Sequence, residues 1–199
     1  MRPVQTRRRR RPEEVERDVL GATLELLQRD GYRGLSVDAV AERSGVAKTT
    51  IYRYFRNKAD LATAALAAFA RPADDPPLPD EPRAALTEVL RRFRARMDAK
   101  GLGVLGSMLQ EDEDPELLEL HRARIVRPRL LAARRALEAA VARGELRADA
   151  DLGLALELAV GGYFAAHISG RELPADWPER VTELLWCGLA VEAATAGAR

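Results

Sequence analysis

One stretch near the N-terminus constrains the fold more than any other part of the chain. Residues 38–61 read DAVAERSGVAKTTIYRYFRNKADL. Apolar residues recur at helical spacing on both sides of Ser44 and Gly45, and a glycine supplies the backbone freedom that a tight reversal needs. The pattern predicts two short helices, over 37–43 and 47–54, joined by a glycine turn. Two such helices form a helix-turn-helix, a motif whose second helix enters the major groove of DNA.

The segments on either side predict how this motif is held. Ser36 is a good N-cap for the first helix, and Asn57 can cap a third helix that runs from Lys58 to Ala70. Upstream, residues 13–29 carry apolar side chains at helical spacing, and Asp30 and Gly31 end that pattern. We therefore expect a platform helix that packs against the two short ones.

The second short helix carries side chains that suit DNA. Its polar residues are a lysine, two threonines, an arginine and two tyrosines within two turns. Lysine and threonine can reach base edges, while hydroxyl groups and cations can hold phosphates. The alternative is an ordinary helical hairpin with a solvated polar face.

The residues themselves resemble a known family. The segment GVAKTTIYRYFRNKADL, with its lead-in DGYRGLSVDAVAERSGV, resembles the recognition helix and its surroundings in TetR-family transcriptional regulators, over residues 15–66. The resemblance implies an all-α fold: an N-terminal three-helix helix-turn-helix domain, followed by a C-terminal helical domain for effector binding and dimerisation. It also implies a homodimeric repressor that a small, largely apolar effector releases from a palindromic, double-stranded DNA operator. The expected division is a disordered basic arm over 1–11, the DNA-binding domain over 12–58 and the effector and dimerisation domain over 59–199.

The same resemblance assigns the DNA contacts. At the start of the recognition helix, Lys48 and Thr49 would face base edges. Hydroxyl groups further along would hold phosphates, or touch a thymine methyl group in the case of Tyr52. Ser36 would approach a phosphate while capping its helix, and Lys58 would clamp one. The full set is Ser36, Lys48, Thr49, Thr50, Tyr52, Tyr54 and Lys58.

The charge of the chain is unevenly distributed. Residues 1–60 hold 14 lysines and arginines against 9 acidic residues, whereas residues 61–199 hold 18 against 22. A run of five arginines that includes Arg8, Arg9 and Arg10 lies at the N-terminus. Beside a helix-turn-helix this run predicts an arm that lies along phosphates or enters a minor groove, and the alternative is a solvated tail.

The remainder of the chain is predicted to be helical. Residues 71–82 contain five prolines and predict a stiff loop. Helices are expected over 83–99, 102–110, 117–142 with a kink at Pro128, 151–169 and 178–195. The last two carry apolar residues on two faces, more than one internal core can cover, so they predict pairing with a second copy. The interface is expected at Leu156, Val160, Val181, Leu185, Gly188 and Leu189.

An effector pocket is implied by the resemblance alone. Adaptable or aromatic side chains on the body helices are its candidates, although such residues at helical spacing also form ordinary core. The candidates are Phe93, Met97, Met108, Leu109, Tyr163, Phe164, His167 and Trp186.

Other classes of protein are disfavoured. His121 and His167 are far apart and lack the spacing of a metal-binding pair, and the acidic run 111–114 lacks the spacing of a calcium loop. Cys187 lies in an apolar segment and is expected in the core. We expect no catalytic residue, metal or cofactor, no membrane association, and a cytoplasmic protein, because neither a signal peptide nor an apolar run of spanning length occurs. Two alternatives remain open: a helix-turn-helix regulator without an effector, acting as a constitutive repressor, an activator or a partner-controlled factor, and a helical interaction module without DNA.

Overall fold

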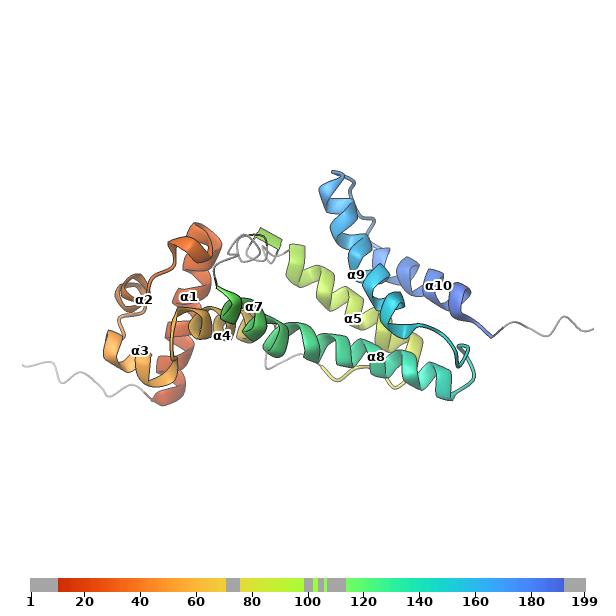
Figure 1. Ribbon diagram of the computed structural model, residues 1–199, viewed down its shortest axis with the longest axis horizontal. Helices are drawn as coiled ribbons and strands as arrows, with labels where there is room; N and C mark the ends of the chain where they lie inside the picture. The colour runs from red at the N-terminus through yellow and green to blue at the C-terminus, as the bar shows by residue number, and fades with distance from the viewer. Residues whose placement is uncertain (1–10, 71–75, 99–101, 104–105, 107–113, 192–199) are drawn as a thin grey trace, which may run out of the picture. The chain divides into compact units, whose positions relative to one another are not determined.

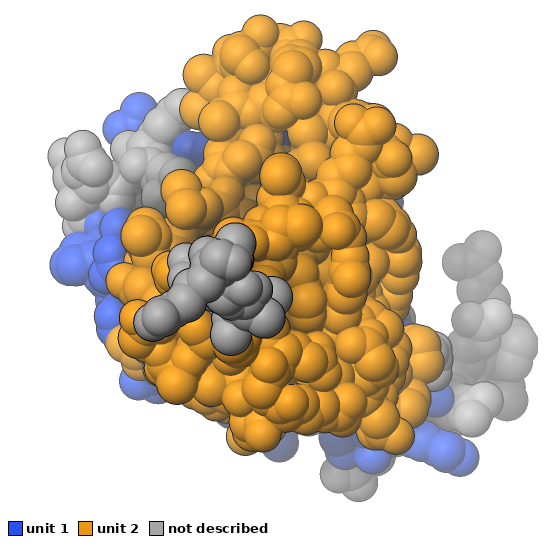
Figure 2. Space-filling model, turned by 90° about the vertical axis from the view of Figure 1, so that its right-hand side faces the viewer, with its two compact units in different colours: residues 1–73, 100–125 blue, residues 74–99, 126–199 orange. Residues whose placement is uncertain are grey.

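The all-α architecture is confirmed over the residues that the computed structural model describes, which are 11–70, 76–98, 102–103, 106 and 114–191 (Figure 1). The chain divides into two compact units. Residues 1–73 and 100–125 form the first, and residues 74–99 and 126–199 form the second (Figure 2, blue and orange). The functional division expected at residue 58 stays a prediction.

The first unit surrounds a small core to which five helices each contribute. Helix α1 packs against α2 and α4, and α4 also packs against α7. Leu27, Val40, Ile51, Leu61 and Leu117 come from α1, α2, α3, α4 and α7 in that order, and each is at most 1% exposed. A fully buried side chain of this size stabilises a fold by about 1.5–3 kcal/mol, so this cluster holds the short helices in place. The helices are α1 (Pro12–Gly34), α2 (Val37–Ser44), α3 (Lys48–Tyr54), α4 (Lys58–Ala70) and α7 (Pro115–His121).

The second unit is a helical bundle. Helix α5 packs against α8 and α10, and α8 packs against α9. Leu86, Leu137 and Leu156 are buried within it, as is Trp177 at the start of α10. Its helices are α5 (Pro82–Arg96), α8 (Arg127–Ala142), α9 (Leu152–Ile168) and α10 (Trp177–Leu189).

The predicted caps and breaks are confirmed in the first unit. Ser36 Oγ accepts the Ala39 backbone N–H at 3.1 Å, and Asn57 Oδ1 accepts that of Asp60 at 2.9 Å. Although α1 extends to Gly34, its backbone leaves helical geometry at Gly31, where φ is 69°. The break thus lies where the sequence placed it, because glycine adopts a positive φ without a steric penalty.

The helix expected over 117–142 is interrupted. A π-helical turn, η2 (Arg122–Val126), joins α7 to α8 just before Pro128. Proline has no N–H to donate to the carbonyl four residues earlier, and its ring crowds that carbonyl. The disturbance predicted at Pro128 therefore occurs in the preceding turn.

Two expectations for α10 are wrong. The helix ends at Leu189 and not at Thr195, because Ala190 leaves helical geometry and pairs as an isolated bridge with Leu146. Leu189 then offers its carbonyl to the Arg147 N–H at 2.9 Å. Cys187, expected in the core, is exposed. Residues 192–199 lie outside the described residues, as do most of 102–110 and the loop residues 71–75.

Candidate functional site

The turn between α2 and α3 fixes the angle of the second short helix. Gly45 has φ 64° and ψ 24°, the left-handed conformation that ends α2 and that side chains disfavour. Val46, next in the chain, is 6% exposed and inserts into the core of the first unit. The reversal is thus held by a backbone conformation on one side and by an apolar anchor on the other.

Helix α3 has a clear division between an inner and an outer face. Ile51 and Phe55, four residues apart, are 1% and 7% exposed. Lys48, Thr49 and Tyr52 lie in exposed positions. An α-helix is about 10–12 Å across with its side chains, so α3 matches a major groove about 12 Å wide. The outer face thus brings together three of the predicted DNA contacts, while Thr50 is half-buried and Tyr54 is 38% exposed at the end of the helix.

Lys48 has an acidic partner that the sequence did not reveal. Its Nζ lies 2.8 Å from Asp38 Oδ2 and 2.7 Å from Oδ1, which joins the start of α3 to α2. The hydrogen bond to Asp38 raises the pKa of Lys48 above its usual value. Lys48 must leave this carboxylate before it can bind any other acceptor. Its side chain is 46% exposed and already at the surface.

The two predicted phosphate contacts outside α3, Ser36 and Lys58, are also engaged within the protein. Ser36 is exposed, but its Oγ caps α2. Lys58 places its Nζ 4.3 Å from the centroid of the Tyr32 ring and donates to the Arg33 carbonyl at 3.4 Å. Tyr32 is itself 3% exposed and donates its hydroxyl to Asp114 Oδ2 at 2.6 Å. Arg8, Arg9 and Arg10 lie outside the described residues.

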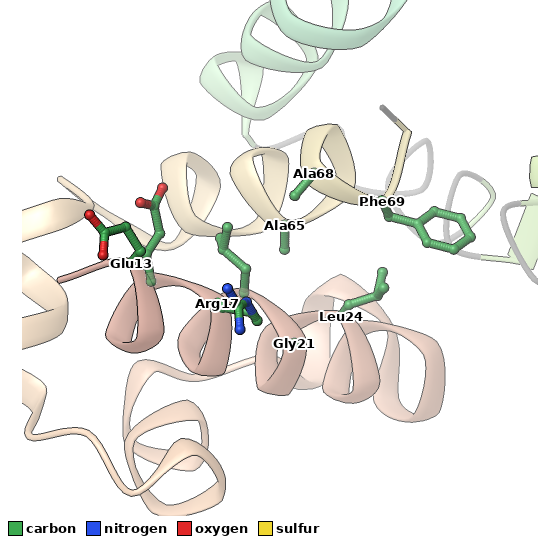
Figure 3. A pocket seen from close by; sticks show the side chains of 9 residues that line it. Glu13, Arg17, Gly21, Leu24, Ala65, Ala68 and Phe69 are labelled. Atoms are coloured by element: carbon green, nitrogen blue, oxygen red, sulfur yellow. The ribbon is translucent and has the colours of Figure 1, made fainter. Parts of the chain in front are cut away.

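A groove in the first unit lies apart from these side chains. It is lined by residues of α1 and α4, among them Leu24, Ala65 and Phe69, and encloses about 360 Å³. Figure 3 shows apolar side chains of both helices pointing into it, with Glu13 at one end. Because the residues that line it come from α1 and α4 alone, it is no part of the outer face of α3.

The effector-pocket candidates separate into two groups. Phe93 makes edge-on contacts with Tyr163 and Phe164 at centroid distances of 5.2 and 6.1 Å, and Tyr163 contacts Trp177 at 5.8 Å. These rings therefore fill the space between α5, α9 and α10 with one another. Trp186 is apart from them, buried on α10, with its Nε1 donating to Glu145 Oε2 at 3.4 Å.

A polar cleft of about 430 Å³ opens beside the rings. Of the predicted pocket residues it contains Tyr163 and the exposed His167. Tyr163 donates its hydroxyl to Asp98 Oδ1 at 2.7 Å. Burial and this hydrogen bond raise the pKa of Tyr163 to about 12. Met97 is 9% exposed at the end of α5, and Met108 and Leu109 lie outside the described residues.

Sequence reasoning missed the polar half of this cleft. Arg94 donates to the carbonyls of Leu173 and Ala175 at 3.1 and 3.3 Å and pairs with Asp98 at 3.2 Å. Its neighbour Arg171 also lines the cleft. The spacing of Arg94 and Asp98, four residues apart on a helix, was the one sequence signal that could have pointed to them.

Four of the six predicted dimer-interface residues border an apolar groove on α9 and α10, and Leu156 and Val160 do not. Val181, Leu185, Gly188 and Leu189 line this groove, which encloses about 600 Å³. Leu156 is 5% exposed within the protomer and offers no surface to a partner. Val160 is half-buried and is not among the lining residues.

The exposed leucines of the groove lie beside the predicted residues in sequence: Leu154 and Leu158 flank Leu156, and Leu184 precedes Leu185. Leu154, Leu158 and Leu184 line the groove and are 51%, 64% and 72% exposed.

Two kinds of feature are absent from the described residues. No helix there is long and apolar enough to cross a membrane. Nor do three or more histidine, cysteine, aspartate or glutamate side chains gather there as a metal site would require.

The chain matches one family along most of its length. Residues 19–65 match the family described as "Bacterial regulatory proteins, tetR family", and residues 76–185 match "Tetracyclin repressor-like, C-terminal domain". The uncharacterized HTH-type transcriptional regulator YdeS of Bacillus subtilis (strain 168) is 30% identical over 195 residues, which cover 95% of this chain and 96% of that protein.

A relative named as a repressor and a solved structure agree with this. The DNA-binding transcriptional repressor TetR of Mycobacteroides abscessus is 32% identical over 148 residues, 71% of this chain and 75% of that protein. The crystal structure of the TetR family transcription regulator SCO0332 matches with a TM-score of 0.62 and 26% identity, covering 89% of this chain and 100% of that one. The chain is therefore a member of the TetR family of helix-turn-helix transcriptional regulators, which bind DNA and are not enzymes.

Proposed function

We propose that this regulator is a homodimeric repressor that binds a palindromic operator through two copies of α3 and leaves it when a small molecule binds the second unit. The observation that carries the proposal is the outer face of α3, where Lys48, Thr49 and Tyr52 are exposed while Ile51 and Phe55 anchor the helix. The relative from Mycobacteroides abscessus is named a repressor, which supports the same sign of regulation here.

The second unit supports the other two parts of the proposal. An apolar groove with exposed leucines is a surface that a second copy can cover, and an isologous pairing of α9 and α10 would bury it in both protomers. The cleft beside Tyr163 and His167 has the volume of a small-molecule site. Because effector and DNA would bind different arrangements of the dimer, each weakens the binding of the other by the same factor.

One observation favours a regulator without an effector. The rings of Phe93, Tyr163, Phe164 and Trp177 pack against one another, so the apolar volume predicted for a ligand is filled by side chains. Screening small molecules for release of a bound operator separates the two functions, because the alternative predicts that none releases it.

DNA binding itself is tested on the region upstream of the protein's own gene. We expect footprinting to protect two half-sites with centres about 10 base pairs apart, one for each α3 of the dimer. Unrelated DNA of the same length serves as the competitor. Equal affinity for both DNAs at physiological salt would contradict the proposal.

The two lysines predict different effects on that binding. We expect Lys48→Ala to relax sequence preference, since a base contact is worth about 1–3 kcal/mol of discrimination. We expect Lys58→Ala to weaken all sequences alike and to flatten the salt dependence of the affinity by about one log–log unit. Fluorescence anisotropy on the operator and on single-base variants, at several salt concentrations, measures both. If both variants lose the same discrimination between the operator and its single-base variants, the assignment of Lys48 to a base and of Lys58 to a phosphate is wrong.

A further inference from the structure

The π-helical turn η2 occupies a special place in the chain. The first unit ends at Ile125 and the second resumes at Val126, so the chain passes between them inside η2. The other two crossings, at 73–74 and 99–100, lie outside the described residues. π-helical turns are rare and occur mostly as single turns inside α-helices, frequently at functional sites. Deformation at η2 therefore acts on the covalent link between the units.

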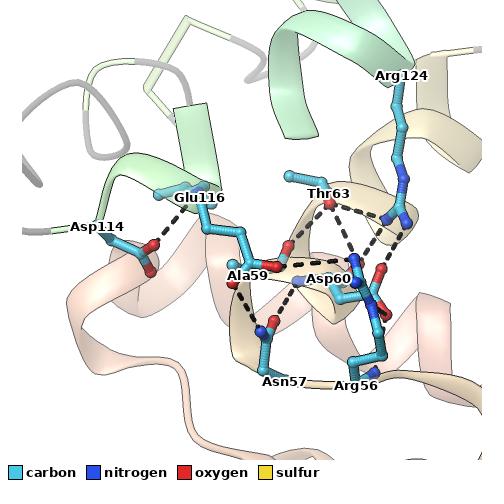
Figure 4. A network of polar contacts seen from close by, with 9 residues as sticks. Arg56, Asn57, Ala59, Asp60, Thr63, Asp114, Glu116 and Arg124 are labelled. Carbon is cyan, nitrogen blue, oxygen red and sulfur yellow. Dashed lines mark hydrogen bonds and ion pairs between the residues drawn. The ribbon is translucent and has the colours of Figure 1, made fainter. Parts of the chain in front are cut away.

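One side chain of this turn is anchored in the first unit. The Arg124 guanidinium donates through Nη1 to the Asp60 carbonyl and to Thr63 Oγ1, at 3.0 Å each, and through Nη2 to Asp60 Oδ1. Figure 4 shows Arg124 reaching from η2 to these two residues of α4. The side chain of Asp60 is only 7% exposed, so the contact is shielded from solvent. Because the planar guanidinium donates three hydrogen bonds to α4, the position of Arg124 against that helix is fixed.

Asp60 continues the connection to the end of α3. Its Oδ2 accepts the backbone N–H of Arg56 at 2.8 Å. Arg56 follows Phe55, whose own N–H closes α3 on the Ile51 carbonyl at 3.0 Å. Burial alone would raise the pKa of Asp60, but the hydrogen bonds from Arg56 and Arg124 outweigh it and lower that pKa. A single ionised carboxylate thus joins the last turn of α3 to η2.

We propose that Asp60 and Arg124 are positioning residues for the recognition helix, and that they transmit changes in the π turn to the orientation of α3. The inference rests on the proposed function, in which α3 reads DNA. A change in the second unit that straightens or rotates η2 would move Arg124, release Asp60 and loosen the turn at Arg56. By linkage, DNA that fixes α3 would in turn steady η2.

A simpler role for the same contact is stability alone. Breaking a buried ion pair is destabilising whether or not it transmits anything, so a loss of stability does not distinguish the two roles. The distinguishing property is coupling, namely a response in η2 to a ligand that binds at α3. The operator DNA is such a ligand, which makes the test independent of any effector.

Hydrogen exchange of the full-length protein, with and without operator DNA, measures this coupling. We expect DNA to slow amide exchange over residues 122–127 by about tenfold in the unchanged protein, within the usual range of coupling between sites. In Arg124→Gln we expect that response to fall below half and the DNA affinity to fall roughly tenfold. The matched control is Arg122→Gln, which is also in η2. The Arg122 side chain is 61% exposed, and its Nη1 lies 3.8 Å from Glu119 Oε2. The control should behave like the unchanged protein.

The outcomes separate this inference from the proposed function. If the unchanged protein binds the operator but η2 does not respond, or if Arg124→Gln responds as fully as Arg122→Gln, the positioning role is overturned. If the unchanged protein fails to bind DNA, the proposed function falls first. Should Arg124→Gln lose its circular dichroism signal, Arg124→Lys keeps the charge with fewer geometrically fixed donors, and we expect an intermediate response from it. A full response in Arg124→Lys with unchanged affinity would also contradict the inference.

Discussion

Leu184→Glu is expected to make the protein monomeric and to lower its operator affinity by at least about 100-fold. Leu184 is 72% exposed and lines the apolar groove of α9 and α10, so the free protomer tolerates a carboxylate there. In a dimer the carboxylate would be buried without a partner, which costs several kcal/mol. The helix-turn-helix of the second protomer would then no longer add its DNA contacts to those of the first. Sedimentation at micromolar concentration measures the oligomeric state, and anisotropy measures the affinity.

The chain offers a matched control for this substitution. Leu131 is 47% exposed on α8 and is not among the residues that line the groove. We expect Leu131→Glu to leave both dimer and affinity unchanged, because its carboxylate stays in water. Leu158→Glu, at 64% exposure on α9, should repeat the effect of Leu184→Glu from the other helix. Dimers of normal affinity from both groove variants would refute the α9–α10 interface.

The second large effect is expected at the anchor of α3. Ile51 is 1% exposed in the core of the first unit. We expect Ile51→Ala to lower the free energy of unfolding by about 2–5 kcal/mol and Ile51→Val by about 0.5–1.5 kcal/mol, since each removed methyl group loses burial and leaves a cavity. Thr49→Ala, on the exposed face of the same helix, should stay within about 0.5 kcal/mol. Denaturant unfolding followed by circular dichroism checks the series.

Tryptophan fluorescence shows which unit loses stability in Ile51→Ala. Trp177 and Trp186 are the two tryptophans of the chain, and both lie in the second unit. Their fluorescence reports that unit, whereas circular dichroism reports both. We expect Ile51→Ala to shift the circular dichroism transition more than the fluorescence transition. Identical curves for Ile51→Ala and the unchanged protein would show that Ile51 does not hold α3.

Local chemistry made the first unit predictable. Ser36, Gly45 and Asn57 each act on backbone groups within four residues, so their roles as cap, turn and cap can be recognised without the fold. Ile51 and Phe55 were recognisable as anchors because helical spacing places them on one face. The choice of Lys48, Thr49 and Tyr52 as DNA contacts came from the resemblance to TetR-family recognition helices, and all three side chains are exposed.

Contacts across the fold were not predictable in the same way. Helix α9 is apolar on two faces, and periodicity cannot tell which face lies inside, so Leu156 was assigned to a surface that Leu154 and Leu158 in fact occupy. The end of α10 depends on pairing between Ala190 and Leu146, 44 positions apart in sequence. Arg124 and Asp60 are 64 residues apart, and no local rule joins them.

The pairing of Lys48 with Asp38 has a consequence for how the protein searches a chromosome. The Asp38 carboxylate competes with DNA for Lys48. The binding free energy that DNA gains from Lys48 is therefore only the difference between pairing with an acceptor on the DNA and pairing with Asp38. A phosphate at an arbitrary position replaces one exposed ion pair by another and gains little. If Lys48 contacts a base, as proposed, a correctly placed guanine, which can offer two acceptors, gains more. Under the proposed function, we expect this competition to shorten the time that the protein spends on irrelevant sequence.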